Sequence, residues 1–383
     1  MTRKEVIVRA IDGRLTWIAA ADILGITARH MRRLKQAYEG QGYGGLVDQR
    51  GIRPRRRRIP VKTIETLCRL RRERYADFSM LHFWEQATEK HGLQLSYTWT
   101  RLVLQAAGLA PKAKARGKYR RKRERRPLIG MLVHLDASTH RWLPDVPPQD
   151  LVVALDDADG RILYAQFWPQ ESTASTFHAL HQVLTHHGRF TELYTDRGSH
   201  FCRTTSAGTA PDLAYDTQVQ RALKALGIRH ILARSPEARG RSERAFGTLQ
   251  GRLPQELRVA GIADYAAANT CLQTTFVPDF NRRFTVKPTQ SGTAFLKLVG
   301  IDLRLVLSSQ HERVVHNDST VTFGRLTLQL PPTKARPHYA RCPVLVHELP
   351  DGSLGLSHHA RLLARYDRTG LLLEAPAAKG RAA

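Results

Sequence analysis

Three acidic residues have the types and settings that metal-assisted phosphodiester chemistry requires. Asp136 and Asp196 each end an apolar run, and the chain turns sharply after the second at Arg197-Gly198. Glu243 lies at the start of a predicted helix. Two carboxylates at strand ends and one on a helix can hold a pair of divalent cations. Such a pair activates a water or a hydroxyl group against a phosphodiester.

The settings of these residues carry more weight than their spacings of 60 and 47 residues, because a chain with 34 acidic residues offers many triples. Asp136 and Asp196 are expected at the rim of a sheet. Glu243 borders an apolar stripe formed by Phe246 and Leu249, which would pack on that sheet. Converging carboxylates raise one another's pKa unless a cation lies between them. Hard oxygen ligands of this kind select Mg²⁺ or Mn²⁺.

A plainer interpretation makes the three residues unrelated surface carboxylates. Asp136 would form a turn before Ser138, Asp196 would form an Asx turn, and Glu243 would make an ion pair at the start of its helix. Residue chemistry alone leaves both interpretations open.

The composition indicates a polyanionic partner. The 383 residues suggest two to four domains, and 42% hydrophobic residues suffice for packed cores. A formal net charge of +26 favours nucleic acid, with a membrane surface as the competing partner. The sequence shows no apolar stretch near the roughly 20 residues that span a bilayer and no signal peptide, so we expect no membrane partner. Four scattered cysteines without CxxC spacing predict a reducing compartment and no zinc site.

The N-terminal third reads as helical. Trp17–Leu24 has helical apolar spacing, Gly25 interrupts it, and Thr27 can cap a second helix that runs through Tyr38. This pattern fits a helix-turn-helix. The outer face of its second helix carries the candidate DNA-binding residues Arg29, Arg32, Arg33 and Lys35. The alternative is an ordinary helical hairpin with a solvated basic face.

Two basic connectors flank a second predicted helical unit at 61–109, in which Ser96 can cap the last helix. The first connector contributes Arg55, Arg56, Arg57 and Arg58. The second, residues 111–127, has Lys or Arg at ten of its seventeen positions, among them Arg120, Arg121, Lys122 and Arg123. Like charges at this density do not pack together, so the segment reads as a linker that binds DNA without regard to sequence. A merely solubilising tether is the alternative.

From Leu128 the pattern changes to alternating strands and helices in the order β-β-β-α-β-α-β-α. Asp156–Gly160 is a hairpin turn signal between the second and third strands, and the helix from Arg241 is expected to stop at Pro254. An antiparallel start followed by α/β crossovers is the ribonuclease H arrangement. After about Gly300 short strands follow, with a turn at Pro350–Ser353, and predict a small β-barrel.

Three segments resemble the signature blocks of insertion-sequence transposases with a retroviral-integrase-like catalytic core. They are His134–Ser138, Leu193–His200 and Ser235–Arg244. A strand ending in Thr-Asp-Arg-Gly, followed later by Ser-Pro, Arg-Gly and Glu-Arg, is the specific part of the likeness. The resemblance implies that Asp136, Asp196 and Glu243 are the catalytic DDE residues and bind two Mg²⁺ (or Mn²⁺) ions. In the third block Arg239, Arg241 and Arg244 are candidates for DNA contact.

The resemblance also implies a multidomain fold. We expect a helix-turn-helix domain at 1–50, a second all-α domain at 60–110, a linker at 111–127, an α/β ribonuclease H-like core with a mixed five-stranded sheet at 128–290, and a small β-barrel at 295–370. The implied function is binding of terminal inverted repeats, strand cleavage and strand transfer. The implied partners are double-stranded DNA, both transposon ends and target, and further copies of the chain in a dimer or larger assembly. No small-molecule substrate is expected, and the expected location is the bacterial cytoplasm, on the nucleoid.

The sequence departs from the family pattern at two places. Many relatives carry Asn three residues after the catalytic Glu, where this chain has Phe246. The segment after Asp196, through Asp212, is longer than in a compact integrase core. Two other functions stay open: a nuclease that cuts without joining, and a DNA-binding regulator with an inactive core.

Other candidate residues have simpler explanations. His134 is expected in the core, and the remaining histidines lack the partners of a zinc site. Trp142 and Trp168 could stack on an unpaired base, but core packing is the favoured interpretation. The acidic residues of the first hairpin, which are Asp156, Asp157 and Asp159, are interpreted as turn formers.

Overall fold

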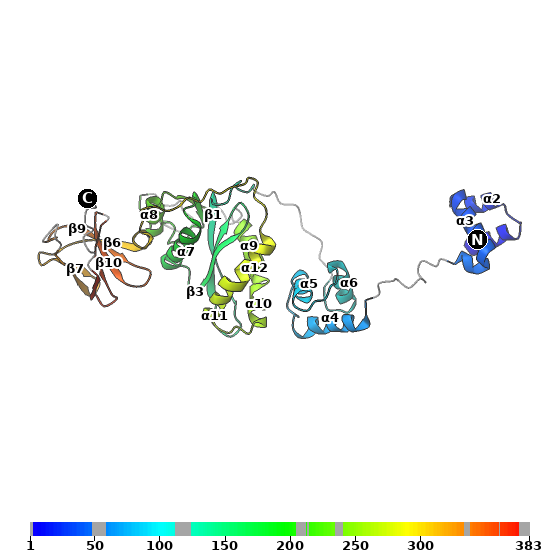
Figure 1. Cartoon of the computed structure of the whole chain (residues 1–383), viewed down its shortest axis with the longest axis horizontal. Coiled ribbons are helices and arrows are strands. Elements are labelled where there is room, and N and C mark those ends of the chain that lie inside the picture. The colour runs from blue at the N-terminus through cyan, green and yellow to red at the C-terminus, as the bar shows by residue number, and fades with distance from the viewer. Residues whose placement is uncertain are drawn as a thin grey trace, which may run out of the picture. The chain divides into compact units, whose positions relative to one another are not determined.

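The computed structural model describes residues 3–47, 59–111, 124–203, 212, 214–233, 240–332, 338–359 and 361–374 (Figure 1). The chain divides into two compact units, Met1–Cys68 and Arg69–Ala383. The predicted linker from 112 to 123 and most of the long segment after Asp196, residues 204–211 and 213, lie outside the described residues.

The N-terminal unit is helical, as the sequence predicts. Its first helices are α1 (Arg3–Ile11), α2 (Trp17–Ile23), α3 (Ala28–Gln41) and the 3-10 helix η1 (Gly42–Leu46). The hydroxyl of Thr27 accepts a hydrogen bond of 3.3 Å from the backbone N–H of His30, which caps α3. Gly25 takes the turn with a φ of +62°. Ala21 and Met31 pack in a small core between the helices, so the predicted helix-turn-helix is confirmed.

The second helical segment contains α4 (Val61–Glu73), α5 (Met80–Glu89) and α6 (Tyr97–Ala106), with the unit boundary inside α4. The hydroxyl of Ser96 accepts a hydrogen bond from the N–H of Trp99 and caps α6, as predicted. The buried guanidinium of Arg71 donates to the carbonyl oxygens of Phe78 and Leu109, at 2.7 and 3.3 Å. The side chain of Arg71 therefore links α4 to the connection between α4 and α5 and to the residues that follow α6.

A mixed five-stranded sheet forms the centre of the larger unit. Its strands are β1 (Leu132–His140), β2 (Gln149–Asp156), β3 (Ile162–Trp168), β4 (Glu192–Thr195) and β5 (Arg229–Leu232), in the order β3-β2-β1-β4-β5. The strands β1, β2 and β3 are antiparallel, and β1, β4 and β5 are parallel. The element order and strand directions are those of the predicted ribonuclease H arrangement.

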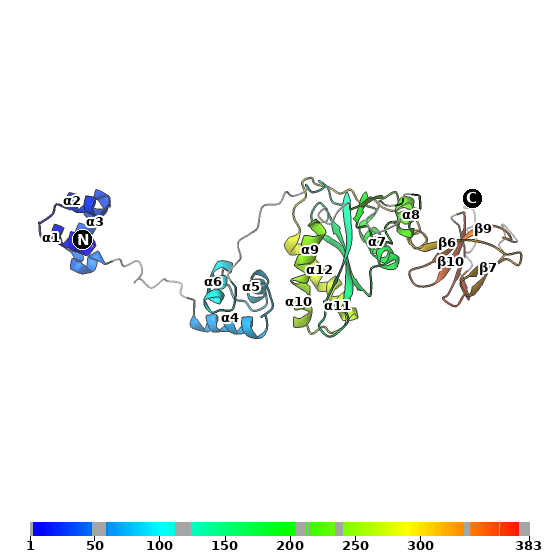
Figure 2. The same cartoon turned by 180° about the vertical axis from the view of Figure 1, so that it is seen from behind.

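Helices cover both faces of this sheet (Figures 1 and 2). They are α7 (Thr173–His187), α8 (Gln218–Ala225), α9 (Gly240–Gln250), α10 (Leu253–Val259), α11 (Tyr265–Cys271), the π-helix η4 (Leu272–Phe276) and α12 (Val277–Phe284). Val133 and Leu135 of β1 belong to the core under α7 and α8. Leu155 of β2 belongs to the core under α9 to α12. Since neighbours along a strand face opposite ways, the even-numbered residues of β1 face α9.

The end of α9 differs from the prediction. The helix ends at Gln250, before Pro254, and Pro254 lies in the first turn of α10. Proline has no N–H to donate, and the first turn of a helix needs none. Pro254 therefore starts the next helix as well as preventing a longer α9.

Helix α5 packs against α10 and α12 through buried ion pairs. The carboxylate of Glu85 lies 2.7 Å from Arg252 and 3.3 Å from Arg283, and all three side chains are 12% exposed or less. Nearby, the imidazole of the fully buried His82 lies 2.7 Å from the carboxylate of Glu256. Residues of α5 are thus held against the helices that cover the sheet, by contacts between segments more than a hundred residues apart.

The C-terminal region is an open sheet and not the predicted barrel. Its elements are α13 (Leu303–Val306), β6 (Ser309–Val314), β7 (Thr320–Phe323), β8 (Leu326–Gln329), β9 (Pro343–Glu348), β10 (Leu354–His358), β11 (Arg361–Tyr366) and β12 (Leu372–Glu374). In the described residues five strands follow the order β12-β11-β10-β9-β6, so the outer strands do not pair. The β7–β8 hairpin packs Val321 and Leu328 against Val346 and Leu356. The β7–β8 hairpin therefore covers one apolar face of the open sheet. In a closed barrel this face would have been buried inside the barrel.

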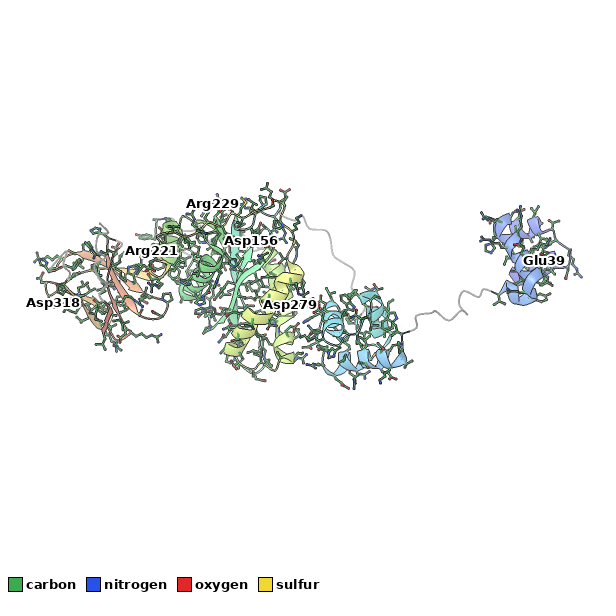
Figure 3. The ribbon with its side chains drawn as sticks, viewed as in Figure 1. Glu39, Asp156, Arg221, Arg229, Asp279 and Asp318 are labelled. Atoms are coloured by element: carbon green, nitrogen blue, oxygen red, sulfur yellow. The ribbon has the colours of Figure 1, made fainter. Side chains whose placement is uncertain are left out.

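The C-terminal sheet is attached to the core by hydrogen bonds from α8. The guanidinium of Arg221 donates to the carbonyl oxygens of Ser308 and Val306, at 2.6 and 3.0 Å (Figure 3). Leu307, next to them, is fully buried in the core under α7 and α8. The segment that leads from α13 into the C-terminal sheet is therefore packed against the central core, while the C-terminal strands have a separate core of their own.

All four cysteines are free thiols, in agreement with the absence of a predicted disulfide framework. Within the described ranges, none of the helices is long and apolar enough to cross a membrane.

Candidate active site

Two of the three predicted carboxylates follow neighbouring, parallel stretches of β1 and β4. Leu132 pairs with Glu192 and His134 pairs with Tyr194 in the parallel β1–β4 ladder. The pairing ends there, and β4 itself ends at Thr195. Asp136 and Asp196 each lie two residues beyond the last pair, with the same offset of 60 residues, and adjacent strands lie about 4.8 Å apart.

Asp136 lies inside its strand, although the sequence predicts it at the strand's end. The apolar run stops there, but β1 continues to His140 because Ala137–His140 pair with Gln149–Val152 of β2. On the other side of β1, the pairing with β4 among the described residues ends at His134 and Tyr194. Asp136 therefore lies at a rim on its β4 side alone.

Both aspartates are oriented by backbone donors. Asp136 is 8% exposed, and its Oδ1 atom accepts a hydrogen bond of 2.9 Å from the N–H of Ala137. The Oδ1 atom of Asp196 accepts one of 2.8 Å from the N–H of Gly198, so the Asx turn considered for this residue does form. Each contact engages one oxygen of its carboxylate, and an Asx turn is compatible with a ligand role.

Helix α9, which carries Glu243, is held beside β1 by one side-chain contact at each of its ends. The Nε atom of Arg241 lies 2.9 Å from Oδ1 of Asp157, and Nε2 of Gln250 donates to Oγ of Ser138 at 2.9 Å. The helix rises about 13 Å over the nine residues between these anchors. Four residues of β1, from His134 to Ser138, span a similar ~13 Å. The helix therefore runs alongside β1, with Glu243 in its exposed first turn.

Asp157 connects the start of β1 with the start of α9. It is fully buried, and its Oδ1 atom also lies 2.7 Å from Nε2 of His134. Burial raises the pKa of Asp157, but the hydrogen bonds from His134 and from the backbone N–H of Arg126, with the charge of Arg241, lower it to about 2. An ionised Asp157 is therefore the fixed point between the segments that carry Asp136 and Glu243.

The interpretation of the first hairpin's acidic residues as simple turn formers is incomplete. Asp156, Asp157 and Asp159 do form the turn, but all three are at most 2% exposed. Asp156 accepts hydrogen bonds from the N–H groups of Gly130 and Ala158, at 2.6 and 2.8 Å. Three acidic residues grouped in a strongly basic chain were the signal that could have identified buried partners. Ser138 and Gln250 carried no comparable signal.

The described residues contain no group of three His, Cys, Asp or Glu side chains placed to hold a metal ion. Asp136, Asp196 and Glu243 share one side of the sheet but do not surround a common point. Residues 234–239, directly before α9, are outside the described residues, and Glu243 lies four positions after the last of them. Three carboxylates are nevertheless the donor set that Mg²⁺ and Mn²⁺ prefer.

The predicted DNA-contacting residues divide into two groups. Arg29, Arg32, Arg33 and Lys35 are exposed on α3, and Arg244 is exposed on α9. Arg241 instead pairs with the buried Asp157. The remaining predicted contacts lie outside the described residues; they are Arg55, Arg56, Arg57, Arg58, Arg120, Arg121, Lys122, Arg123 and Arg239.

The remaining candidate residues pack in the core. Trp142 is 1% exposed and its indole N–H donates to the carbonyl oxygen of Gln149. Trp168 is half-buried and donates to the hydroxyl of Tyr164. Phe246, which replaces the polar residue of many relatives, is 6% exposed in the core under α9. The packing interpretations of both tryptophans and of His134 are confirmed.

Comparison with known proteins identifies the family. Residues 2–57 match a helix-turn-helix domain family. The chain is 34% identical over 357 residues to "Putative transposase y4bF" of Sinorhizobium fredii, covering 92% of this chain and 78% of that protein. The chain belongs to the insertion-sequence transposase family. A further member of this family, the transposase for insertion sequence IS1202 of Streptococcus pneumoniae, is 29% identical over 360 residues, covering 84% of this chain and 76% of the relative.

Solved structures of retroviral integrases are also similar to this transposase. The dimeric HTLV-2 integrase catalytic core in complex with magnesium is 16% identical, with a TM-score of 0.31 over 43% of this chain and 94% of that one. The simian T-cell lymphotropic virus intasome in complex with the PP2A regulatory subunit B56 gamma is 14% identical, with a TM-score of 0.34 over 76% and 98%. Both TM-scores are below 0.5, whereas the strand order β3-β2-β1-β4-β5 is a property of this chain itself.

Proposed function

We propose that this transposase cleaves and joins DNA at a metal-dependent site formed by Asp136, Asp196 and Glu243. The observation that supports the proposal is the β1–β4 ladder, whose last pair is His134–Tyr194; the same offset, carried two residues further, would bring Asp196 next to Asp136 on the side of the sheet that α9 covers. Glu243 lies on the first turn of that helix. The proposal requires Glu243 to approach the two aspartates when DNA and metal bind.

The carboxylates would hold the metal, and the other residues would position them. Mg²⁺ or Mn²⁺ ions bound there would polarise a phosphodiester and activate the attacking water or hydroxyl group. The N–H groups of Ala137 and Gly198 hold one oxygen of each aspartate. The contacts of Arg241 with Asp157 and of Gln250 with Ser138 hold α9 in position alongside β1.

The reaction would proceed in two steps on the same site. Hydrolysis at the end of the element frees a 3′-hydroxyl group. That hydroxyl then attacks a phosphodiester of the target in line, and the target's own 3′-oxygen leaves, so no covalent bond to the enzyme forms. The two steps differ only in their nucleophile and therefore need no second active site.

The helical domains would bind the terminal inverted repeats. The exposed basic residues of α3 suit the phosphates that flank a DNA groove. The net charge of +26 offsets the repulsion between two DNA segments brought side by side. Since an element has two ends, the working assembly would contain at least two copies of the chain.

A strand-transfer assay tests this proposal. A duplex that ends in the element's terminal sequence, already cleaved at its 3′ end, is incubated with a target plasmid, Mg²⁺ and the full-length protein. We expect joined products with the wild type and none with Asp136→Asn or Glu243→Gln. Cleavage of an intact end without joining would instead indicate a nuclease.

A further inference from the structure

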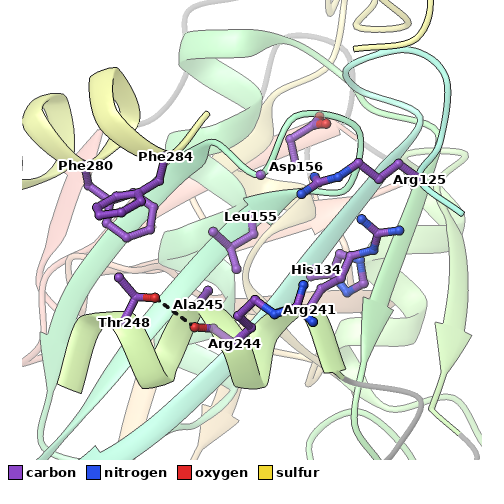
Figure 4. A pocket seen from close by; sticks show the side chains of 11 residues that line it. Arg125, His134, Leu155, Asp156, Arg241, Arg244, Ala245, Thr248, Phe280 and Phe284 are labelled. Carbon is purple, nitrogen blue, oxygen red and sulfur yellow. Dashed lines mark hydrogen bonds between the residues drawn. The ribbon is translucent and has the colours of Figure 1, made fainter. Parts of the chain in front are cut away.

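A cavity of about 180 Å³ lies between α9, α12 and the β2–β3 turn (Figure 4). It opens beside the first turns of α9, the helix that carries Glu243. Glu243 does not line it. Its walls combine the cationic and apolar side chains of Arg125, Arg241, Arg244, Leu155, Phe280 and Phe284. His134 and Asp156 also line it, and the carboxylate of Asp156 is satisfied by the backbone N–H groups of Gly130 and Ala158.

The arginines of the cavity are fixed in place by the fold. The guanidinium of Arg125 donates to the carbonyl oxygen of Asp157 at 3.0 Å, and that of Arg241 pairs with the carboxylate of the same residue. A guanidinium has five N–H donors, so these contacts orient Arg125 without using all of its donors. Arg244 is exposed at the rim. The cavity therefore presents oriented positive charge at its mouth.

The floor of the cavity is apolar and aromatic. Phe280 is 5% exposed, and its ring centroid lies 4.8 Å from that of Phe284. Leu155 of β2 closes the bottom between them and α9. Phe280 is buried and Arg252 lies over the ring of Phe284 at 4.8 Å, so the half-buried Phe284 offers the remaining aromatic surface. Aromatic side chains stack on nucleobases of any sequence, and arginine adds to the stacking and binds phosphate.

The size of the cavity restricts the ligand. Its volume corresponds to about six water molecules at their share of liquid volume, which excludes a double helix but admits one base. A phosphate alone would satisfy the arginines and leave the aromatic floor unused. An unpaired nucleotide uses both parts.

We propose that this cavity binds a single unpaired nucleotide of the DNA substrate, with the base over Phe280 and Phe284 and its phosphate at Arg125 and Arg244. The inference rests on the proposed function for its substrate. The cavity is lined by His134, two residues before Asp136 on β1, and by Arg241 and Arg244, which flank Glu243 on α9. A nucleotide held here would keep the DNA strand next to the scissile bond out of the duplex stack.

A binding assay without metal tests the proposal separately from catalysis. The full-length protein in EDTA is titrated against a fluorescent duplex, the same duplex with one extra unpaired adenine, and the same duplex with one extra abasic nucleotide. We expect the wild type to prefer the adenine bulge by about tenfold, as expected for one stacked base, and to show no such preference for the abasic bulge. Asp196→Asn should keep the preference, because it changes only the predicted catalytic site.

Three variants locate the binding. Phe284→Leu keeps apolar volume but removes the ring, Arg244→Gln removes the rim charge, and Ala245→Met fills the cavity from α9. Phe284→Leu and Ala245→Met should reduce the preference to less than about twofold, whereas Arg244→Gln should weaken binding of the adenine and abasic bulges alike and keep the preference for adenine. The control Arg282→Gln removes an equally exposed charge from α12 that does not line the cavity, and should leave the preference intact.

Three results would overturn the proposal. They are a wild type without any preference, an equal preference for the abasic bulge, and a preference that survives in folded Phe284→Leu and Ala245→Met. Thermal unfolding of each variant establishes that it is folded.

Discussion

The guanidinium of Arg241 lies 2.9 Å from the carboxylate of Asp157, which is fully buried at the end of β2. The same carboxylate oxygen accepts from His134, two residues before Asp136 on β1. Arg241 likewise lies two residues before Glu243, on α9. One buried carboxylate therefore sets the distance between the two segments that carry the outer members of the predicted catalytic triad.

Replacing Asp157 should reduce catalysis much more than DNA binding. Asp157→Asn leaves the partly buried Arg241 without its counter-charge and lets the start of α9 shift. A displacement of about 1 Å at an active site can lower the rate about 100-fold, and we expect a decrease of that order in the rate of end cleavage. We expect DNA affinity within about twofold of the wild type in a gel-shift assay, because Asp157 is fully buried.

Asp145→Asn is the matched control, because Asp145 is an exposed acid in the connection between β1 and β2. It should cleave at the wild-type rate. The double variant Asp157→Asn/Arg241→Gln should be no slower than the slower single variant, since both break the same contact. A folded Asp157→Asn protein with wild-type cleavage would show that the contact does not position α9.

The buried ion pairs between α5 and the core should contribute measurably to stability. Glu85→Gln leaves Arg252 and Arg283 close together and nearly buried, so the free energy of unfolding should fall by about 2 kcal/mol or more. The exposed ion pair of Asp216 and Lys224 provides the comparison. Asp216→Asn should change the free energy of unfolding by less than ~0.5 kcal/mol. Urea unfolding followed by tryptophan fluorescence measures both. Equal effects would contradict a role for the buried network.

Acid should weaken the C-terminal sheet through His347. This side chain is 3% exposed between the hydroxyl groups of Ser308 and Ser357, and its burial lowers the pKa to about 4. The unfolded chain binds the proton at an ordinary pKa near 6.5, so stability is complete above that pH and is lost as the pH falls toward 4. The loss should reach about 3 kcal/mol.

Thiol labelling of Cys342, which is buried in the same sheet, reports this loss because labelling requires opening. The labelling rate, corrected for thiol ionisation, should rise between pH 6.5 and 4 in the wild type. His347→Gln keeps hydrogen-bonding groups without a titrating proton and should show a flatter dependence. An unchanged dependence in this variant would assign the acid sensitivity to other groups.

Binding of DNA by α3 should follow the salt dependence of phosphate contacts. Arg33→Gln should weaken binding to the element's end and reduce the slope of log affinity against log salt by about 0.9. Arg9→Gln removes an exposed charge from α1 in the same unit and should leave that slope unchanged. Equal slopes for the two variants would indicate diffuse electrostatic binding and exclude a specific role for α3.

The sequence predicted the elements whose causes are local. Thr27 and Ser96 cap helices because a hydroxyl group needs only the next turn of its own chain. The order of strands and helices in the core was predicted from apolar periodicity and turn residues. These features determine element type before any long-range contact forms.

Long-range contacts explain what the sequence did not predict. The length of β1 beyond Asp136 depends on pairing with β2, and Ala137–His140 are too polar to read as a strand alone. Asp157 reads as a turn residue because its partner Arg241 lies far along the chain. The C-terminal sheet stays open because a hairpin covers its apolar face, and strand spacing alone cannot distinguish that arrangement from closure.

The most direct test of the account measures cleavage and binding of the same DNA end by Asp196→Asn. This change removes one negative charge from a residue that follows the end of β4, two residues beyond the last β1–β4 pair, and that we propose as a metal ligand. With Mg²⁺ we expect cleavage to fall below detection while affinity for the DNA end stays within about twofold, because the change leaves the basic surfaces intact. Cleavage retained near the wild-type rate would contradict the assignment of Asp136, Asp196 and Glu243 as one catalytic site.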